Sequence, residues 1–265
     1  MQKIIRRICS RIERLSFNRF NIIKTLYINF RCLPFEQAKK LPIYIFGSPY
    51  FNNLSGRITI LGEIKKGMIK INETRPFAPS LQTVNSQLLI AGELVFRGPY
   101  FIGTGTKILV AKDAKLVLGS KGKITDFVNL SCWSCITIGD MTRITHRCQI
   151  NDSNNHFIAN MNNRTIPNDT RPIYIGNRCF ICNNTSIMAG SILPNNVIVG
   201  SSSLINKDFS MLPETSLIAG IPAKCISTGY IRIYNEQMEL DLIEYYKNHN
   251  VVYDIPEDFD IEQYS

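Results

Sequence analysis

The sequence predicts a parallel β-helix, and two regularities and one exclusion carry that prediction. Aliphatic residues recur every six positions along the third quarter of the chain, at Ile175, Ile181, Ile187, Leu193, Val199 and Ile205. Four positions after each of the first five stands a small or β-branched residue, namely Cys179, Thr185, Ser191, Val197 and Ser203. A period of six keeps no apolar stripe on one face of an α-helix, which excludes a helical solenoid. Three such units close one triangular coil of about eighteen residues, and successive coils pair at strand spacing.

The composition agrees with one folded unit that has a large core. The chain has 265 residues, 45% hydrophobic and 19% charged, so disorder over its whole length is excluded. The net charge of +9 is uneven: residues 1–40 hold ten Lys/Arg and two acids, whereas residues 230–265 hold two and nine. A basic start and an acidic end indicate two different surfaces rather than uniform binding to nucleic acid.

Residues 1–40 form a basic amphipathic segment. Within residues 3–24, apolar residues recur at helical intervals and arginines flank them. Two interpretations stay open: an end cap with a solvated basic face, or attachment to anionic lipid at the inner face of the membrane. The arginines interrupt any apolar run of the kind a signal peptide needs. We therefore expect a cytoplasmic protein in which the eight cysteines are reduced thiols.

Residues 41–229 form the predicted β-helix, with one interruption. The six-residue rhythm is also present upstream, at Ile90, Phe96, Ile102, Ile108, Leu118, Ile124, Leu130, Ile136, Ile138, Ile144 and Ile150, and more faintly at Ile58 and Ile64. Six positions after Ile150 stands His156, where an inward aliphatic residue is required, and the rhythm resumes only at Ile175. The polar, proline-containing stretch 151–172 is predicted to be a loop that leaves the coil, and such loops commonly carry function.

Residues 230–265 are predicted to form a short C-terminal helix, over 234–248, followed by an acidic tail. Catalysis is not expected there.

The sequence IYIGNRCFICNNTSIMAGSILPNNVIVGSSSLINKDF, followed by LIAGIPAKCI, resembles the hexapeptide-repeat acyltransferases. The resemblance covers roughly residues 85–227 and includes a terminal Gly-Ile-Pro-Ala-Lys turn from Gly220 to Lys224. It implies a mainly β fold, the left-handed parallel β-helix, an exception to right-handed crossovers. It also implies a homotrimer and sugar O-acetyltransfer, as in capsule or lipopolysaccharide synthesis or in maltose and galactoside acetyltransferases.

Acyl transfer to a hydroxyl needs a base near the acceptor oxygen, and a neutral imidazole suits this task. The chain has three histidines. His146 is expected on the outer wall of the coil, and His249 lies in the predicted tail. The resemblance makes His156 the general base, because Asp152-Ser-Asn-Asn-His156 is similar to the family's acidic motif.

The same resemblance suggests roles for three further residues near the loop. Asp152 would orient the histidine or a neighbouring loop. Asn154, which stands where relatives often have a second acid, and Asn129 would both contact the acceptor.

The resemblance implies acetyl-CoA as the donor, lying along the coil between subunits. The small residues Ala189, Gly190, Gly200, Ser201 and Ser202 would admit its pantetheine arm, and Lys207 and Lys224 would bind its phosphates. No metal is required. The pairs Cys132–Cys135 and Cys179–Cys182 are too far apart in the sequence for a zinc ribbon, and the second pair fits the small-residue positions of the repeat.

We therefore expect an acetyl-CoA-dependent sugar O-acetyltransferase in which the hydroxyl attacks the thioester directly. The alternatives are an amino-sugar N-acetyltransferase, a zinc carbonic anhydrase using three histidines, and a non-catalytic β-helix that serves as a scaffold or binding module.

Overall fold

Three parallel sheets form the walls of the molecule, whose computed structural model describes residues 19–74 and 84–255. One sheet contains, in spatial order, β1 (Ile43–Ile45), β4 (Ile69–Ile71), β7 (Tyr100–Ile102), β10 (Gly122–Ile124), β13 (Arg143–Ile144), β16 (Phe180–Ile181), β19 (Ile198–Val199), β21 (Leu217–Gly220) and β22 (Ala223–Ser227). The second contains β2 (Tyr50–Asn53), β5 (Gln87–Ile90), β8 (Lys107–Val110), β11 (Asn129–Cys132), β14 (Gln149–Asn151), β17 (Ser186–Met188) and β20 (Leu204–Ile205). The third contains β3 (Arg57–Ile60), β6 (Glu93–Phe96), β9 (Lys115–Leu118), β12 (Cys135–Ile138), β15 (Ile173–Ile175) and β18 (Ile192–Leu193).

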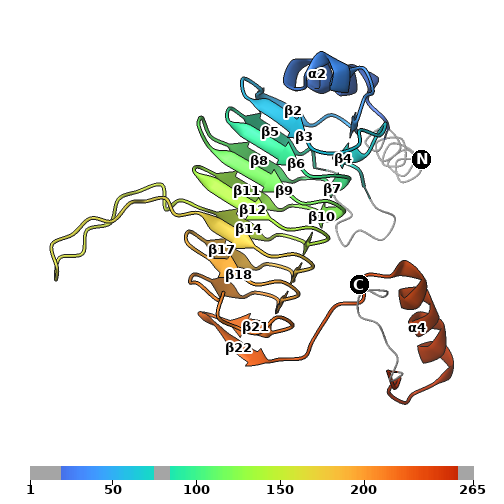
Figure 1. Cartoon of the computed structure of the whole chain (residues 1–265), viewed down its shortest axis with the longest axis vertical. Helices are drawn as coiled ribbons and strands as arrows, with labels where there is room; N and C mark the ends of the chain where they lie inside the picture. Colours follow the sequence, from blue (N-terminus) through green and yellow to red (C-terminus); the bar gives the residue numbers. More distant parts are fainter. Residues whose placement is uncertain (1–18, 75–83, 256–265) are drawn as a thin grey trace, which may run out of the picture.

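Each coil contributes one strand to each sheet, so that equivalent residues stack from coil to coil (Figure 1). In the first sheet Ile144 pairs in register with Ile124 on one side and with Ile181 on the other. All three side chains are fully buried. This is the arrangement of the left-handed parallel β-helix, and it confirms the fold that the repeat predicts.

The aliphatic positions of the repeat form the core. From Ile90 to Ile205, every inward residue that the rhythm identifies is at most 2% exposed. The small positions are buried as well: Cys179, Thr185 and Ser191 are fully buried. Hydroxyls at these positions satisfy corner carbonyls, as when Ser203 Oγ donates to the Gly200 carbonyl at 2.6 Å.

The β-helix begins well before the region of family resemblance. Its first strand is β1 at residue 43, and Ile58 and Ile64 belong to its early coils, Ile58 buried and Ile64 packed against the core. Two helices cover this end, α2 (Ile22–Cys32) and α3 (Phe35–Ala38). The Asn21 side chain caps α2 by accepting from Lys24 N at 3.0 Å. Most of the predicted basic helix 3–24 lies outside the described residues.

The other end closes with a hairpin and a detached helix. Strands β21 and β22 pair antiparallel, after which the chain runs to α4 (Glu236–Asn248), close to the predicted 234–248. This segment is held to the β-helix by the Tyr234 hydroxyl, which donates to the Cys179 carbonyl at 3.1 Å, and by Arg232, which stacks on Phe180. No side chain of α4 is buried. Among the described helices, none combines the length and apolar character needed to cross a bilayer.

Candidate active site

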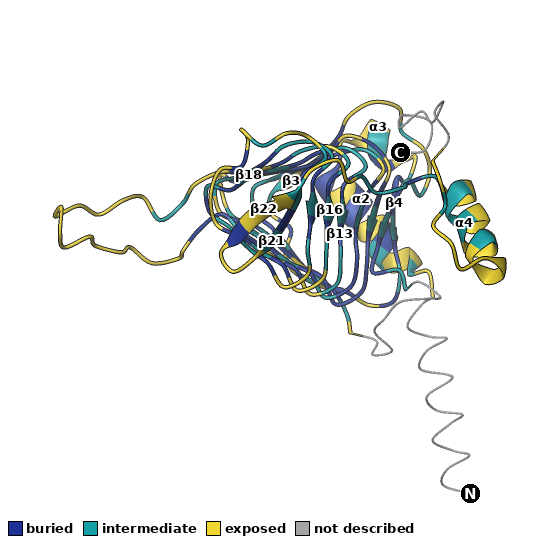
Figure 2. Cartoon of the chain, turned by 90° about the horizontal axis from the view of Figure 1, so that it is seen from below, coloured by how far each residue is buried: buried dark blue, intermediate teal, exposed yellow. Residues whose placement is uncertain are grey.

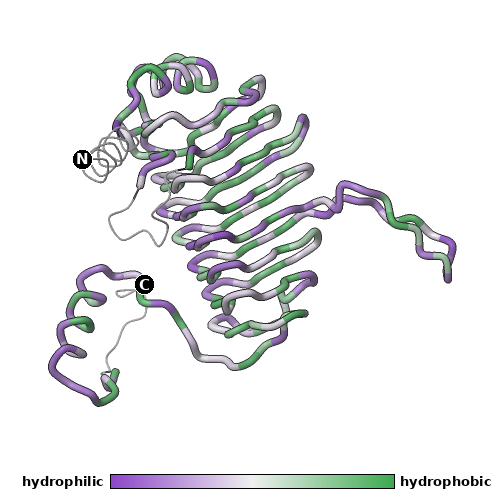
Figure 3. The backbone as a smooth tube through the Cα atoms, turned by 180° about the vertical axis from the view of Figure 1, so that it is seen from behind, coloured by the Kyte–Doolittle hydropathy of each residue, from purple (hydrophilic) through white to green (hydrophobic). Residues whose placement is uncertain are grey.

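The interruption of the repeat is a long arm that leaves the β-helix between β14 and β15 (Figure 1). Every residue from 154 to 168 is exposed, as Figure 2 shows by the arm's colour. Two antiparallel bridges hold its strands together, Ser153 with Thr170 at the root and Asn160 with Thr165 near the tip. The arm carries hydrophobic as well as hydrophilic stretches (Figure 3). Its exposed apolar side chains are Phe157, Ile158, Met161 and Ile166.

His156 lies near the root of this arm and contacts no polar partner among the described residues. The residue is exposed, and no hydrogen bond or ion pair joins it to another described group. Where the inward aliphatic residue is missing, the chain leaves the coil, as the sequence predicts. The backbone leaves the coil after Asp152, and the imidazole is free to meet a ligand or another subunit.

Asp152 serves the wall of the β-helix rather than the imidazole. It is completely buried. One carboxylate oxygen accepts from Trp133 N at 2.7 Å, and the other accepts from Ser134 N at 2.9 Å and Cys135 N at 2.8 Å. These three N–H groups form the turn between β11 and β12 of the preceding coil. Asp152 therefore orients a neighbouring turn, one of the two tasks considered for it, and fixes the point from which the arm departs.

The two asparagines proposed for the acceptor lie on the same side as the arm. Asn154 is exposed, and its backbone N–H donates to the Asp169 carbonyl at 2.9 Å across the root. Asn129 begins β11 and pairs in register with Gln149 of β14, the strand that leads into the arm. Its residue is half-buried on the outer wall.

Ala189 and Gly190 adjoin the root of the arm. They form the turn between β17 and β18, directly above the corner from which the arm leaves. Gly190 N donates to the Arg171 carbonyl at 3.1 Å. A side chain added at Gly190, where φ is +82°, would lie 3.2 Å from the Arg171 guanidinium. The Arg171 side chain therefore covers Gly190, and Ala189 is only 2% exposed.

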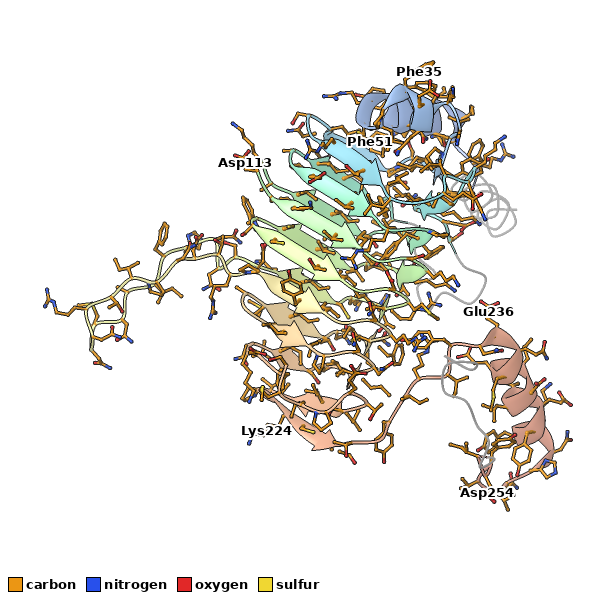
Figure 4. The ribbon with its side chains drawn as sticks, viewed as in Figure 1. Phe35, Phe51, Asp113, Lys224, Glu236 and Asp254 are labelled. Carbon is orange, nitrogen blue, oxygen red and sulfur yellow. The ribbon has the colours of Figure 1, made fainter. Side chains whose placement is uncertain are left out.

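The other residues predicted for CoA lie elsewhere on the coil. Gly200, Ser201 and Ser202 form the corner between β19 and β20, which joins the first sheet to the second. Lys207 is exposed beside Phe209, its Nζ 5.0 Å from the ring centroid. Lys224 is exposed on β22 at the end of the β-helix (Figure 4). Within one chain, therefore, only Ala189–Gly190 accompanies His156.

The remaining histidines differ from His156 in their surroundings. His146 packs edge-on against Phe127 at 5.5 Å, and its Nδ1 is buried without a partner among the described residues. Burial and the charge of Arg147 lower its pKa, against the opposing effect of Asp126. His249 caps α4 and stacks on Tyr245 at 4.4 Å. No three His, Cys, Asp or Glu side chains gather into a possible metal site among the residues described.

Among known proteins, a curated relative matches part of the chain. No family model matches the chain. The chain is 27% identical over 157 residues to WbbJ of Escherichia coli K12, provisionally named a lipopolysaccharide biosynthesis O-acetyl transferase. The alignment covers 56% of this chain and 76% of WbbJ. In its stacked six-residue repeat and in this likeness, the chain is similar to the hexapeptide-repeat acetyltransferases.

Solved structures similar to this chain include two acetyltransferases of polysialic acid. The polysialic acid-specific acetyltransferase NeuO has 20% identity and a TM-score of 0.42, with 78% of this chain and 94% of NeuO covered. The polysialic acid O-acetyltransferase OatWY has 20% identity and a TM-score of 0.41, with 75% and 99% covered. A hexapeptide-repeat acetyltransferase of Vibrio cholerae, solved with acetyl coenzyme A, has 20% identity and a TM-score of 0.36, with 56% and 69% covered.

Sequence reasoning missed one cluster on the outer face of the first sheet. Arg143 of β13 and Arg232 of the C-terminal segment both lie against the Tyr234 ring, with guanidinium-to-centroid distances of 5.5 Å and 4.9 Å. The signal in the sequence was Arg143, a charged residue directly before the inward-facing Ile144. Its partners, Arg232 and Tyr234, lie about ninety positions further along the chain and outside the six-residue repeat.

Proposed function

We propose that the protein transfers the acetyl group of acetyl-CoA to a sugar hydroxyl during synthesis of a surface polysaccharide. The observation that carries the proposal is His156, exposed near the root of the arm with no hydrogen-bond or ion-pair partner among the described residues. The class of acceptor is supported by the likeness to WbbJ.

In this mechanism the neutral imidazole of His156 takes the proton of the acceptor hydroxyl as its oxygen attacks the thioester carbonyl. A C–O bond forms and the C–S bond breaks. The leaving sulfur of CoA then receives the proton from the imidazolium. Backbone groups of the Ala189–Gly190 turn are candidates to stabilise the charge that develops on the carbonyl oxygen.

The state of the cysteines favours direct attack over an acyl-cysteine intermediate. Desolvation raises the pKa of Cys179 to about 12 and that of Cys148 to about 11, so both thiols stay protonated at neutral pH. Nucleophilic cysteines need the opposite shift.

A second copy of the chain would complete the site. The arm exposes Phe157, Ile158 and Met161 at 71%, 62% and 77% of their surfaces, which are large apolar areas to leave in water. We propose a homotrimer in which each arm packs on a neighbouring β-helix. CoA would then lie between subunits, with Ala189–Gly190 and Gly200–Ser202 along its arm and Lys207 and Lys224 at its phosphates. Size-exclusion chromatography with light scattering measures this assembly.

We place the enzyme in the cytoplasm, where acetyl-CoA is available, with its N-terminal end against the inner face of the membrane.

The decisive experiment measures CoA release by the purified protein against a panel of neutral, acidic and amino sugars. His156→Ala should reduce the rate by at least about a hundredfold, within the range that general-base catalysis supplies. Asn163→Ala, near the tip of the same exposed arm, is the control and should keep the wild-type rate. Full activity of His156→Ala would exclude the mechanism, and transfer only to amino sugars would make the enzyme an N-acetyltransferase.

A further inference from the structure

A cavity of about 270 Å³ lies between the outer face of the first sheet and the segment that leads to α4. Three consecutive coils supply one side of it, with Lys123, Arg143 and Phe180 as neighbours in register on β10, β13 and β16. Arg232 and Tyr234 supply the other side. In Figure 2 α4 lies beside the face formed by β13 and β16, whereas the arm leaves on the opposite side.

Aromatic rings hold the two guanidinium groups of this cavity side by side. Arg232 lies 4.6 Å from the Phe180 centroid and 4.9 Å from that of Tyr234, and Arg143 lies 5.5 Å from the same Tyr234 ring. The Tyr234 ring is 8% exposed and fixed by its hydrogen bond to Cys179. Stacking of this kind orders an arginine before any ligand arrives, which reduces the entropy that binding costs.

The carboxylates of the cavity leave Arg143 without an acidic partner. Glu239 pairs with Arg232 at 3.5 Å, and Glu236, at the start of α4 (Figure 4), lies 3.9 Å from Lys123. Among the described residues, Arg143 makes no ion pair and one hydrogen bond, from Nη1 to the Lys121 carbonyl at 3.0 Å. Burial and the nearby charge of Arg232 lower the pKa of Arg143, although an arginine stays charged near neutrality. The fold thus keeps a partly desolvated cation beside a second one.

We propose that this cavity binds the anionic group of a small acidic sugar, either a carboxylate or a phosphate, through the free edge of the Arg143 guanidinium. A planar guanidinium matches both groups with two parallel hydrogen bonds. The rings of Phe180 and Tyr234 offer apolar surface to the sugar itself. The anion would also offset the repulsion between Arg143 and Arg232. That the anion is carried by a sugar rests on the proposed function; the anion site itself does not.

Calorimetric titration of the full-length protein tests the proposal with three matched probes. Glucose 6-phosphate carries the phosphate, glucuronate carries the carboxylate, and glucose carries neither. We expect at least one acidic sugar to bind and glucose to give no heat. Which acidic sugar binds more tightly identifies the preferred anion. Absence of binding by both acidic sugars at millimolar concentration would overturn the site.

Variants then locate the binding. Arg143→Met should lower the affinity for the acidic sugar by at least about tenfold, the typical loss for one charged hydrogen-bonded pair. Arg97→Met removes an exposed arginine from an upstream corner and should leave affinity unchanged. Arg143→Lys keeps the positive charge but cannot form two parallel hydrogen bonds. Its affinity for the acidic sugar should therefore lie between the affinities of Arg143→Met and Arg97→Met. Thermal unfolding checks that each variant is folded. Wild-type affinity in folded Arg143→Met would refute the assignment.

One further variant separates this inference from the proposed catalysis. His156→Ala should bind the acidic sugar as the wild type does while losing acetyl transfer. Anion binding in a protein that never transfers acetyl would leave the cavity assignment intact and remove the proposed function. Normal acetyl transfer without anion binding would leave the proposed function intact and remove the cavity assignment.

Discussion

Asp152 is a buried carboxylate that organises a neighbouring turn of the β-helix. Its two oxygens accept three backbone N–H groups of the turn from Trp133 to Cys135. Asp152→Ala should lower the free energy of unfolding by roughly 3 kcal/mol, because the partly buried donors lose their acceptor. Asn154→Ala, two positions away with an exposed side chain, should change it by less than about 0.5 kcal/mol. Urea unfolding followed by circular dichroism measures both. Equal stability of the two variants would contradict the structural role.

Two buried tyrosines give a second test, because among the described residues only one of them forms a hydrogen bond through its hydroxyl. The Tyr100 hydroxyl is buried without a partner among the described residues, whereas that of Tyr234 donates to Cys179. Tyr100→Phe should therefore leave stability unchanged or raise it by up to about 1 kcal/mol, since an unsatisfied polar group is removed. Tyr234→Phe should lower it by about 1 kcal/mol. Thermal denaturation of the pair checks the order, and a Tyr100→Phe variant less stable than Tyr234→Phe would reverse the argument.

Among the structural elements, the coils were predictable because each coil repeats the same six-residue pattern and packs on the coils next to it. The position of Ile144 in the sequence already fixes its neighbours Ile124 and Ile181 in space. The arm was predictable for the same reason, since a missing inward residue interrupts a known rhythm. The contacts of Asp152 leave no such trace, because its partners are backbone N–H groups that any residue supplies. The cavity around Tyr234 was missed because the C-terminal segment meets β13 only after the whole β-helix has folded.

The arm should be dispensable for folding of the coil and indispensable for activity. Its two ends are joined by the Ser153–Thr170 bridge, so a two-residue turn can replace residues 155–168 without stretching the backbone. We expect the shortened protein to keep its β-sheet circular dichroism, because the deleted residues are exposed and contribute nothing to the core. Acetyl transfer should be abolished with the loss of His156. Restoring a histidine alone, as the first residue of the new turn, should not restore transfer if the arm also serves assembly. A folded, fully active deletion would contradict both roles.

At the scale of the whole molecule, the N-terminal end of the β-helix combines positive charge with exposed apolar side chains. The N-terminal end presents one face of α2 to solvent, with Ile23 76% exposed and Phe30 48% exposed, and Phe35 of α3 68% exposed. The opposite face of α2 packs on the first coil through Ile28 and Cys32. Residues 19–40 include five basic side chains and one acid. Apolar side chains ringed by cations are the chemistry that an anionic bilayer matches.

We therefore predict that the full-length protein binds vesicles containing phosphatidylglycerol and does not bind vesicles of phosphatidylcholine alone. The double variant Ile23→Ser/Phe30→Ser should bind at least about tenfold more weakly, because two large apolar side chains no longer enter the interface. Ile243→Ser removes a similarly exposed residue from the acidic helix α4, and should bind as the wild type does. Co-sedimentation measures the bound fraction, and its decline with added salt reports the electrostatic share. If the double variant instead altered the oligomeric state while vesicle binding stayed the same, the α2 face would be an interface between copies of the chain.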